Sequence, residues 1–175
     1  MKNSIKIFIV LFTFLLPMEK RLFASDVYFI DYSKVMNEST AGKKAQDYLK
    51  NLLKNSNKKF NDTAKKLKDE ENKIISQKNA LSKEEYKKKA DALRKKVFEL
   101  NKGRDKLIRD VAAKRKKAGD DMLKKLNPIL GKYMEENNIS VVIDKKNVLM
   151  GNKKFEITSQ IIEILNKEFK SINLN

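Results

Sequence analysis

The chain has 175 residues, of which 36% are charged, and its formal net charge at pH 7 is +17. This length predicts one domain, or one domain with a long extension, and the positive balance favours anionic partners such as nucleic acid, an anionic membrane surface or acidic proteins. Because Cys and His are absent, disulfides, thiolate nucleophiles, Cys/His zinc sites and a histidine general base are excluded. The chain also lacks a glycine-rich phosphate-binding motif, so we expect no cofactor.

The N-terminal region has the pattern of an export signal. Lys2 and Lys6 precede the apolar run 7–16, which is too short to span a bilayer as a helix. Ala24 is a small residue at a suitable cleavage position. We therefore predict a signal peptide over residues 1–24 and a mature chain located outside the cytoplasm. An uncleaved membrane anchor is the alternative interpretation.

Residues 26–31, DVYFID, predict a strand, and helix-forming residues predominate from residue 39 to residue 136. In the second half of this helical stretch a heptad row is formed by Tyr86, Ala90, Leu93, Val97, Leu100, Arg104, Leu107 and Val111. In the first half an apolar row is formed by Leu53, Phe60, Leu67, Ile74 and Leu81, beside a polar row formed by Ser56, Thr63, Glu70 and Gln77. The pattern predicts a long antiparallel helical hairpin whose first helix contributes only half a coiled-coil seam.

The sequence also indicates where the hairpin reverses. Ser82 and Glu85 have the spacing of a capping box, and Leu81 and Tyr86 have the spacing of a hydrophobic staple. A helix should therefore start at Ser82, which predicts the tip of the hairpin near residues 76–82.

Three residues in the second predicted helix are unusual there. Pro128 should kink or restart the helix because it lacks a backbone N–H group. Gly103 and Gly119 each weaken a helix by about 1 kcal/mol relative to Ala. For the glycines two interpretations stay open: variation without consequence, or a bendable arm.

The C-terminal part changes character. ISVVID predicts a strand, VLM (148–150) a second strand, and FEITSQIIEILNKEF a terminal helix with Thr158 as its N-cap. Residues 25–38 and 137–175 would then form a small β-body that buries little apolar surface by itself. Because short strands leave open edges, we expect several chains to share this body. The candidate oligomerisation residues are Val27, Phe29, Ile30, Val141, Val142, Ile143, Val148 and Leu149.

Several segments together suggest a known family. These are STAGKKAQ after the first strand, LSKEE at the hairpin tip, NPI before the final part, and the closing VVID, VLM and ITSQIIEILN. Over essentially the whole mature chain this pattern resembles the Skp/OmpH family of periplasmic chaperones. The resemblance implies a mostly α fold with a small β-body, and a jellyfish-shaped homotrimer whose hairpin arms enclose a cavity. It further implies a non-enzymatic protein that holds unfolded outer-membrane proteins without ATP until they are assembled.

The positive charge is concentrated on the arms. Residues 43–132 contain 29 Lys or Arg and 13 Asp or Glu, a net charge of +16, and the rest of the mature chain is slightly negative. Such a surface attracts acidic clients and anionic lipid or lipopolysaccharide headgroups. The candidate contact residues are Phe60, Leu67, Ile74, Tyr86, Lys87, Lys88, Lys89, Arg94, Lys95 and Lys96. Individually, the apolar ones would serve hairpin packing and the basic ones a solvated face.

Three other functions were weighed against this hypothesis. Asp31 and Asp144 could form a catalytic carboxylate pair, but Asp residues at strand ends usually serve turns and caps, so we expect no enzyme. A basic nucleic-acid-binding protein is disfavoured by the export signal. A structural coiled coil of the cell envelope, without clients, stays open as an alternative.

Overall fold

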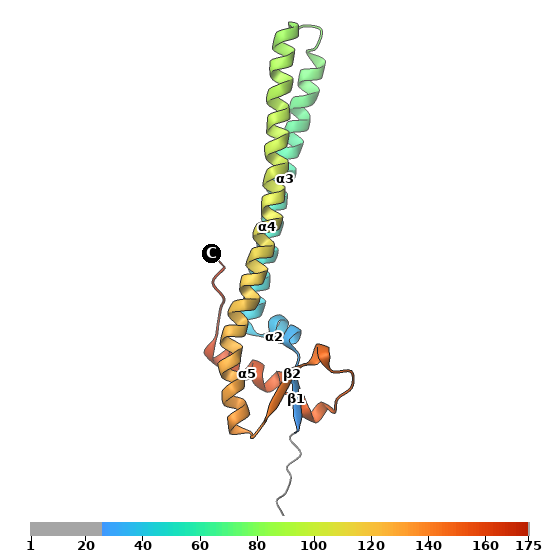
Figure 1. Ribbon diagram of the computed structural model, residues 1–175. Helices are drawn as coiled ribbons and strands as arrows, with labels where there is room; N and C mark the ends of the chain where they lie inside the picture. The colour runs from blue at the N-terminus through green and yellow to red at the C-terminus, as the bar shows by residue number, and fades with distance from the viewer. Residues whose placement is uncertain (1–25, 175) are drawn as a thin grey trace, which may run out of the picture.

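The computed structural model describes residues 26–174, and the predicted signal peptide lies outside these residues. A long helical hairpin projects from a small mixed α/β base (Figure 1). In chain order the elements are β1 (Val27–Ile30), α2 (Tyr32–Glu38), α3 (Thr40–Ser76), α4 (Lys83–Glu136), β2 (Val141–Asp144), the 3-10 turns η1 (Lys145–Asn147) and η2 (Lys153–Phe155), and α5 (Thr158–Glu168). Within residues 26–174, no helix is long and apolar enough to cross a membrane.

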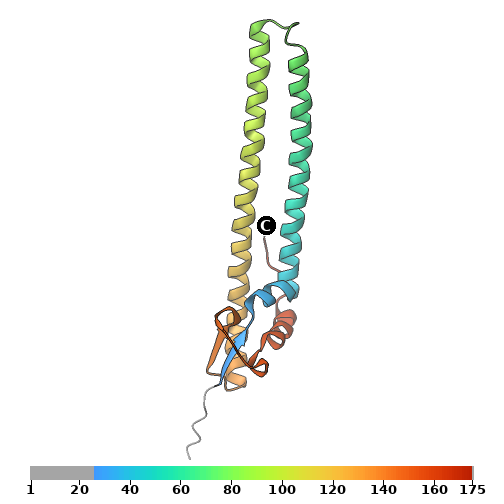
Figure 2. The ribbon, with the colours of Figure 1, turned by 90° about the vertical axis from the view of Figure 1, so that its right-hand side faces the viewer.

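The predicted hairpin is confirmed. Helices α3 and α4 run side by side from the base to the tip, as Figure 2 shows. The predicted capping box is also present: Ser82 Oγ accepts from the Glu85 amide at 3.2 Å, and Glu85 Oε2 accepts from the Ser82 amide at 3.0 Å. Hydrogen bonds from the Ser82 hydroxyl and amide lower the pKa of Glu85. The tip is thus fixed by satisfied backbone donors rather than by burial.

Helix α4 contains 54 residues and continues through Pro128 to Glu136. The sequence predicts a kink or a restart at Pro128, and of these two the restart does not occur. Met122, Leu126 and Ile129, on either side of the proline, are buried in the core of the base. Their burial offsets the hydrogen bond that proline cannot donate.

The core of the base lies where α2, α4 and α5 meet one face of the sheet. Its buried members are Ile30, Val35, Ala41, Met122, Leu126, Ile129, Ile157, Ile161, Ile162 and Leu165. Strands β1 and β2 pair in parallel, with Val27 opposite Val141 and Ile30 opposite Asp144. Asp31 caps α2 by accepting from the Lys34 amide at 2.8 Å, and Asp144 caps η1 by accepting from the Lys146 amide at 3.2 Å. The two strand-end carboxylates thus serve as caps, as expected.

The predicted strand at residues 148–150 is wrong. After β2, the Asp144 cap turns the chain into η1, and residues 148–150 contain no strand. The place beside β1 is taken by the segment before α5 instead. Phe29 forms a parallel bridge with Glu156, and the Ile157 amide donates to the Phe29 carbonyl at 3.0 Å. The backbone groups of β1 are thereby paired on both sides at Phe29.

Thr158 is buried, but it is not the N-cap of α5, which is Ile157. Thr158 Oγ1 accepts from the Asp31 amide at 2.9 Å, and the hydroxyl donates to Glu156 Oε1 at 3.0 Å. Lys145 Nζ donates to the same carboxylate at 3.1 Å. Burial would raise the pKa of Glu156, but the hydrogen bonds from Lys145 and Thr158 lower it. The hydroxyl therefore joins the end of β1 to the start of α5.

We expect Thr158→Val to lower the free energy of unfolding by about 1–3 kcal/mol, because it leaves the Asp31 amide without a partner. Chemical denaturation followed by circular dichroism measures the change. The same substitution at the exposed Thr63, whose hydroxyl donates to the Lys59 carbonyl in its own helix, should stay within about 0.5 kcal/mol of the wild type. Equal stability of the two variants would contradict this role of Thr158.

Candidate functional site

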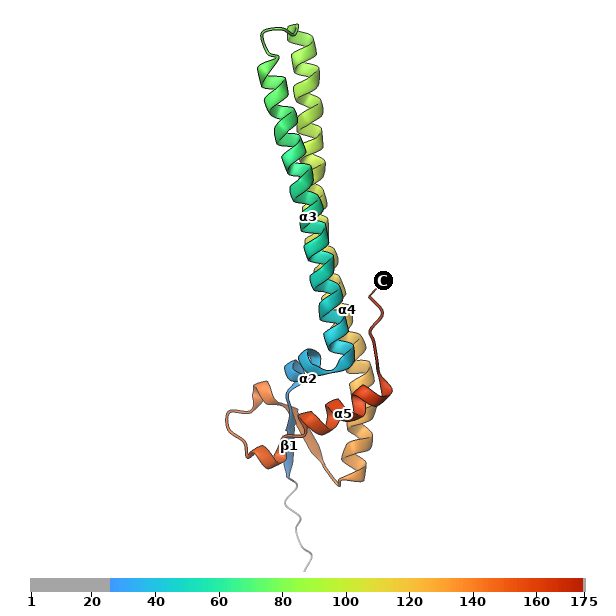
Figure 3. The ribbon, with the colours of Figure 1, turned by 180° about the vertical axis from the view of Figure 1, so that it is seen from behind.

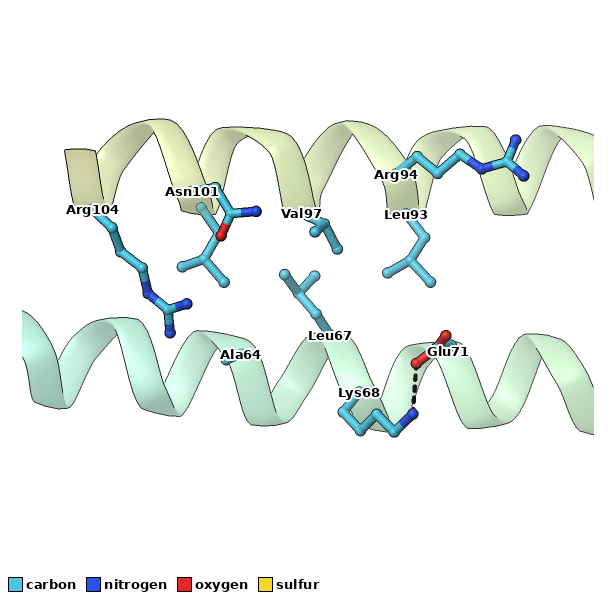
Figure 4. A pocket seen from close by; sticks show the side chains of 10 residues that line it. Ala64, Leu67, Lys68, Glu71, Leu93, Arg94, Val97, Asn101 and Arg104 are labelled. Atoms are coloured by element: carbon cyan, nitrogen blue, oxygen red, sulfur yellow. Dashed lines mark hydrogen bonds and ion pairs between the residues drawn. The ribbon is translucent and has the colours of Figure 1, made fainter. Parts of the chain in front are cut away.

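The middle of the arm carries open grooves between α3 and α4. The half-seam of α3 places Leu67 between the helices, pointing towards Leu93 and Val97 of α4 (Figure 4). One groove is lined by Ala64, Leu67, Lys68, Glu71, Leu93, Arg94, Val97, Leu100, Asn101 and Arg104. A second groove along the same stretch is lined by Thr63, Leu67, Ala92, Lys95, Lys96, Glu99 and Leu100. Leu67 lines both grooves, and Thr63 of the polar row lines the second.

The structure places the predicted apolar contact residues mostly inside the hairpin. Leu67 and Ile74 are buried, while Phe60 and Tyr86 are half-buried. The ring of Phe60 packs against Gly103, where an added Cβ would lie 3.1 Å from Phe60 Cε1. These side chains hold α3 and α4 together, and their contact with a client stays a prediction.

Two large apolar side chains on the outside of α4 were missed by the sequence analysis. Phe98 is 63% exposed and Ile108 is 66% exposed. Both fall outside the heptad row, and a heptad pattern identifies only the residues that pack between the helices. Ile75 of α3 and Val97, at the edge of the seam, are also more than a third exposed. The arm therefore presents apolar side chains as well as charge.

All six predicted basic residues are exposed. Lys96 Nζ lies 2.7 Å from Glu70 Oε1 across the hairpin, and Lys89 Nζ donates to Gln77 Oε1 at 3.1 Å. Arg94 pairs with Asp91 in its own helix at 2.8 Å. Among residues 26–174, Lys87, Lys88 and Lys95 form no ion pair. Half of the set thus supports the hairpin or its own helix, and the other half is available to a partner.

Gly103 and Gly119, two of the three glycines of α4, contact side chains from other helices. Gly103 leaves room for the ring of Phe60, as described above. The carbonyl of Gly119 accepts a hydrogen bond from the Tyr32 hydroxyl at 2.9 Å, which ties α4 to α2. Burial and the nearby Asp120 carboxylate raise the pKa of Tyr32. The close approach of Phe60 gives Gly103 a packing reason that was not visible in the sequence, whereas a Cβ at Gly119 would lie at an ordinary contact distance of 3.7 Å from the Tyr32 hydroxyl.

The predicted oligomerisation residues fall into three groups by exposure. Phe29 and Ile30 are buried within the subunit, while Val142, Ile143 and Val148 are half-buried. Val27 and Val141, which pair with each other, are exposed, and Leu149 is 104% exposed. Their role in assembly stays a prediction.

The loop that carries Leu149 is held in place by its neighbours. A Cβ at Gly151 would lie only 2.8 Å from the ring of Phe29, so the loop approaches the sheet closely there. The loop therefore displays Leu149 and Met150 away from the core, where both are almost fully exposed.

Both the sequence and the fold of this chain are similar to those of known proteins. The family described as outer membrane protein (OmpH-like) matches residues 26–165. The chain belongs to the OmpH-like family. Its fold is similar to the crystal structure of a proposed outer membrane chaperone (OmpH-like) from Caulobacter crescentus CB15, with a TM-score of 0.78 and 19% sequence identity. The alignment covers 84% of this chain and 87% of that chain. A search of curated proteins found no match.

The contact between Gly103 and Phe60 in this OmpH-like arm can be tested by a double-mutant cycle. Gly103→Ala gains helix propensity but places a methyl group against the Phe60 ring. We therefore expect the substitution to be more stabilising in a Phe60→Ala background than in the wild type, by about 0.5–1 kcal/mol. Thermal unfolding of the four proteins gives the coupling energy. Strict additivity would mean that the two positions do not touch in solution.

Proposed function

We propose that this protein is an ATP-independent, non-enzymatic chaperone of the periplasm, which holds unfolded outer-membrane β-barrel proteins and delivers them for assembly. The observation that carries the proposal is the arm: a continuous α4 projects a charged hairpin with open grooves and exposed apolar side chains away from a small base. An unfolded chain offers scattered apolar residues rather than one shape. Weak, plural contacts along an arm suit such a ligand better than a single pocket would.

The proposal includes a homotrimer, in which three bases meet and three arms surround a cavity. Val27 and Val141, which pair with each other, are exposed, and so are Leu149 and Met150 of the loop after β2, although large apolar side chains are usually covered in a stable soluble protein. Short strands with open edges also favour pairing with another chain. The proposed trimer is supported by these exposed apolar side chains and by the open strand edge of the base. The proposed location requires cleavage of a signal peptide near Ala24.

The charge of the arm would mainly raise the rate at which clients associate with the protein. The excess of +16 over residues 43–132 creates a positive field around the proposed cavity. Acidic barrel proteins would be attracted to it, as would anionic lipid or lipopolysaccharide surfaces. Lysine side chains can also cover apolar client surface with their methylene groups while the ammonium groups stay hydrated.

A structural coiled coil without clients is less well supported. Such a rod would be expected to close its seam, whereas here the seam is open in the middle and Phe98 and Ile108 face solvent. Small-angle scattering distinguishes the two shapes, because an open cage and an extended rod differ in their distance distributions. Cell fractionation tests the nucleic-acid alternative, which requires a cytoplasmic protein.

We expect purified residues 25–175 to have the mass of a trimer in solution and to suppress aggregation of a urea-diluted β-barrel protein at low salt without ATP. Light scattering measures both quantities. Suppression should weaken as salt rises, because screening shortens the range of the arm's field. Absence of suppression at low salt would refute the proposed function.

Charge on the arm should matter more than the same charge on the base. Lys87→Gln combined with Lys88→Gln should weaken binding of an acidic unfolded barrel at low salt by roughly two- to tenfold, with a shallower dependence on salt. The matched control removes two exposed lysines of the base, through Lys153→Gln and Lys167→Gln. Fluorescence anisotropy with a labelled client measures both pairs. Equal effects would show that only net charge acts.

A further inference from the structure

The segment that follows α5 lies against the base of the arm. Residues 169–174, here called the C-terminal segment, leave α5 and run alongside α4 (Figures 1 and 3). In the view turned by 90° the segment is in line with the space between α3 and α4 (Figure 2). It therefore follows the line where the two helices meet, although residues 170–174 are neither helix nor strand.

An apolar side chain anchors this segment. Leu174 is only 4% exposed, and it is buried together with Ala45 and Leu49 of α3 and with Val111 and Ala118 of α4. These four apolar residues of the two helices thus surround the leucine side chain. We call the hollow formed by these four residues the arm-base groove.

Two lysines of α4 hold the backbone of the segment. Lys114 Nζ donates to the Leu174 carbonyl, and Lys117 Nζ donates to the Asn173 carbonyl. Each of these two lysines also contacts another side chain of the arm. The ammonium of Lys114 lies 5.6 Å from the centre of the Tyr48 ring, and Lys117 pairs with Asp121 at 2.7 Å.

Lys117 is the group that faces Asp121 most closely. Its hydrogen bond is the main cause that lowers the pKa of the Asp121 carboxyl. The arm-base groove therefore has two cations along one edge, beside an apolar floor.

These contacts use apolar side chains and main-chain groups of the segment. Besides Leu174, the half-buried Ile172 packs against the same cluster, and the two lysines contact two successive backbone carbonyls. Extended stretches of an unfolded polypeptide with apolar residues at alternate positions offer the same groups. The side chain of Ser171 is exposed. The arm-base groove is therefore built to accept an irregular or extended peptide through its main chain.

We propose that the arm-base groove is a binding site for a short unfolded segment with an apolar side chain, and that the C-terminal segment occupies it as a built-in competitor. The identification of that unfolded segment as part of a client rests on the proposed function. A tether of a few residues keeps the competitor at an effective concentration in the millimolar range. A client segment can displace the C-terminal segment only if the client is already bound elsewhere on the protein, so that its own local concentration is similarly high. In the empty chaperone the apolar floor therefore stays covered.

The test uses the full mature chain, residues 25–175, with Leu174→Asp. A carboxylate at position 174 is strongly disfavoured in an apolar hollow, so the C-terminal segment should leave the groove. The matched control is Ser171→Asp, which adds the same charge at an exposed position of the same segment. The probe is a labelled, C-terminally amidated peptide with the sequence of residues 169–174, FKSINL, and its binding is followed by fluorescence anisotropy.

We expect the Leu174→Asp chain to bind this peptide about tenfold more tightly than the wild type or the Ser171→Asp control, because the competitor is removed. Adding Lys114→Gln should weaken the binding again, and a peptide with Asp in place of its leucine should not bind. Equal peptide affinity of the three chains would overturn the proposal. Circular dichroism and mass confirm that each variant is folded and assembled like the wild type.

A client assay separates this proposal from the proposed function. If Leu174→Asp binds the peptide tightly but no variant suppresses aggregation of a β-barrel protein, the groove is confirmed as a peptide site and the holdase function fails. If aggregation is suppressed but the peptide does not bind Leu174→Asp, the holdase function stands and the groove proposal fails. Tighter client binding by Leu174→Asp than by Ser171→Asp supports both.

Discussion

The continuity of α4 is the constraint on which the rest of the structure depends. Met122 and Leu126 lie at the centre of the base, while Leu93 and Leu100 of the same helix form the seam of the arm. Because no loop separates these two parts, the arm keeps a defined direction relative to the base without an interface of its own. The hydrogen bond from Tyr32 to the Gly119 carbonyl and the burial of Leu174 add contacts at the point where the helix leaves the core. A hairpin with a weak seam can therefore project far into solvent, since its attachment does not rely on that seam.

The features that could be predicted from the sequence are those that local interactions decide. The heptad rows, the capping box at Ser82 and the two strands depend on neighbours in sequence or on strong periodicity, and the structure confirms them. The pairing of β1 with β2 joins residues that are far apart in the chain and was not predicted. The failures have tertiary causes. Residues 148–150 have the composition of a strand, but the place beside β1 is filled by Glu156, and the hydroxyl of Thr158 is used by the Asp31 amide of a distant segment. Pro128 would restart an isolated helix, yet core packing on both sides of it keeps α4 continuous.

The candidate site shows the same division. The basic residues of the arm were found because their abundance is visible in the sequence. Phe98 and Ile108 were missed because a seam is sought at heptad positions, although an apolar residue off the seam of a charged helix is itself a signal of an exposed contact. The C-terminal segment gave no signal at all. A single leucine after the last helix shows no periodicity, and its partners, Leu49 and Val111, belong to helices that come together only in the folded chain.

The parallel pairing of β1 and β2 has a consequence for how the protein folds. Parallel strands need a crossover connection, and here that connection is the whole arm, since Val27 pairs with Val141. Closing so long a loop in an unfolded chain is slow, because its ends seldom meet. The hairpin removes this difficulty: once a turn forms at Ser82, α3 and α4 can pair progressively from the tip and bring the two strands together. During synthesis β1 therefore stays without its partner β2 until residues 141–144 have been added. Pairing of α3 with α4 thus brings together the two strands from which the base is built.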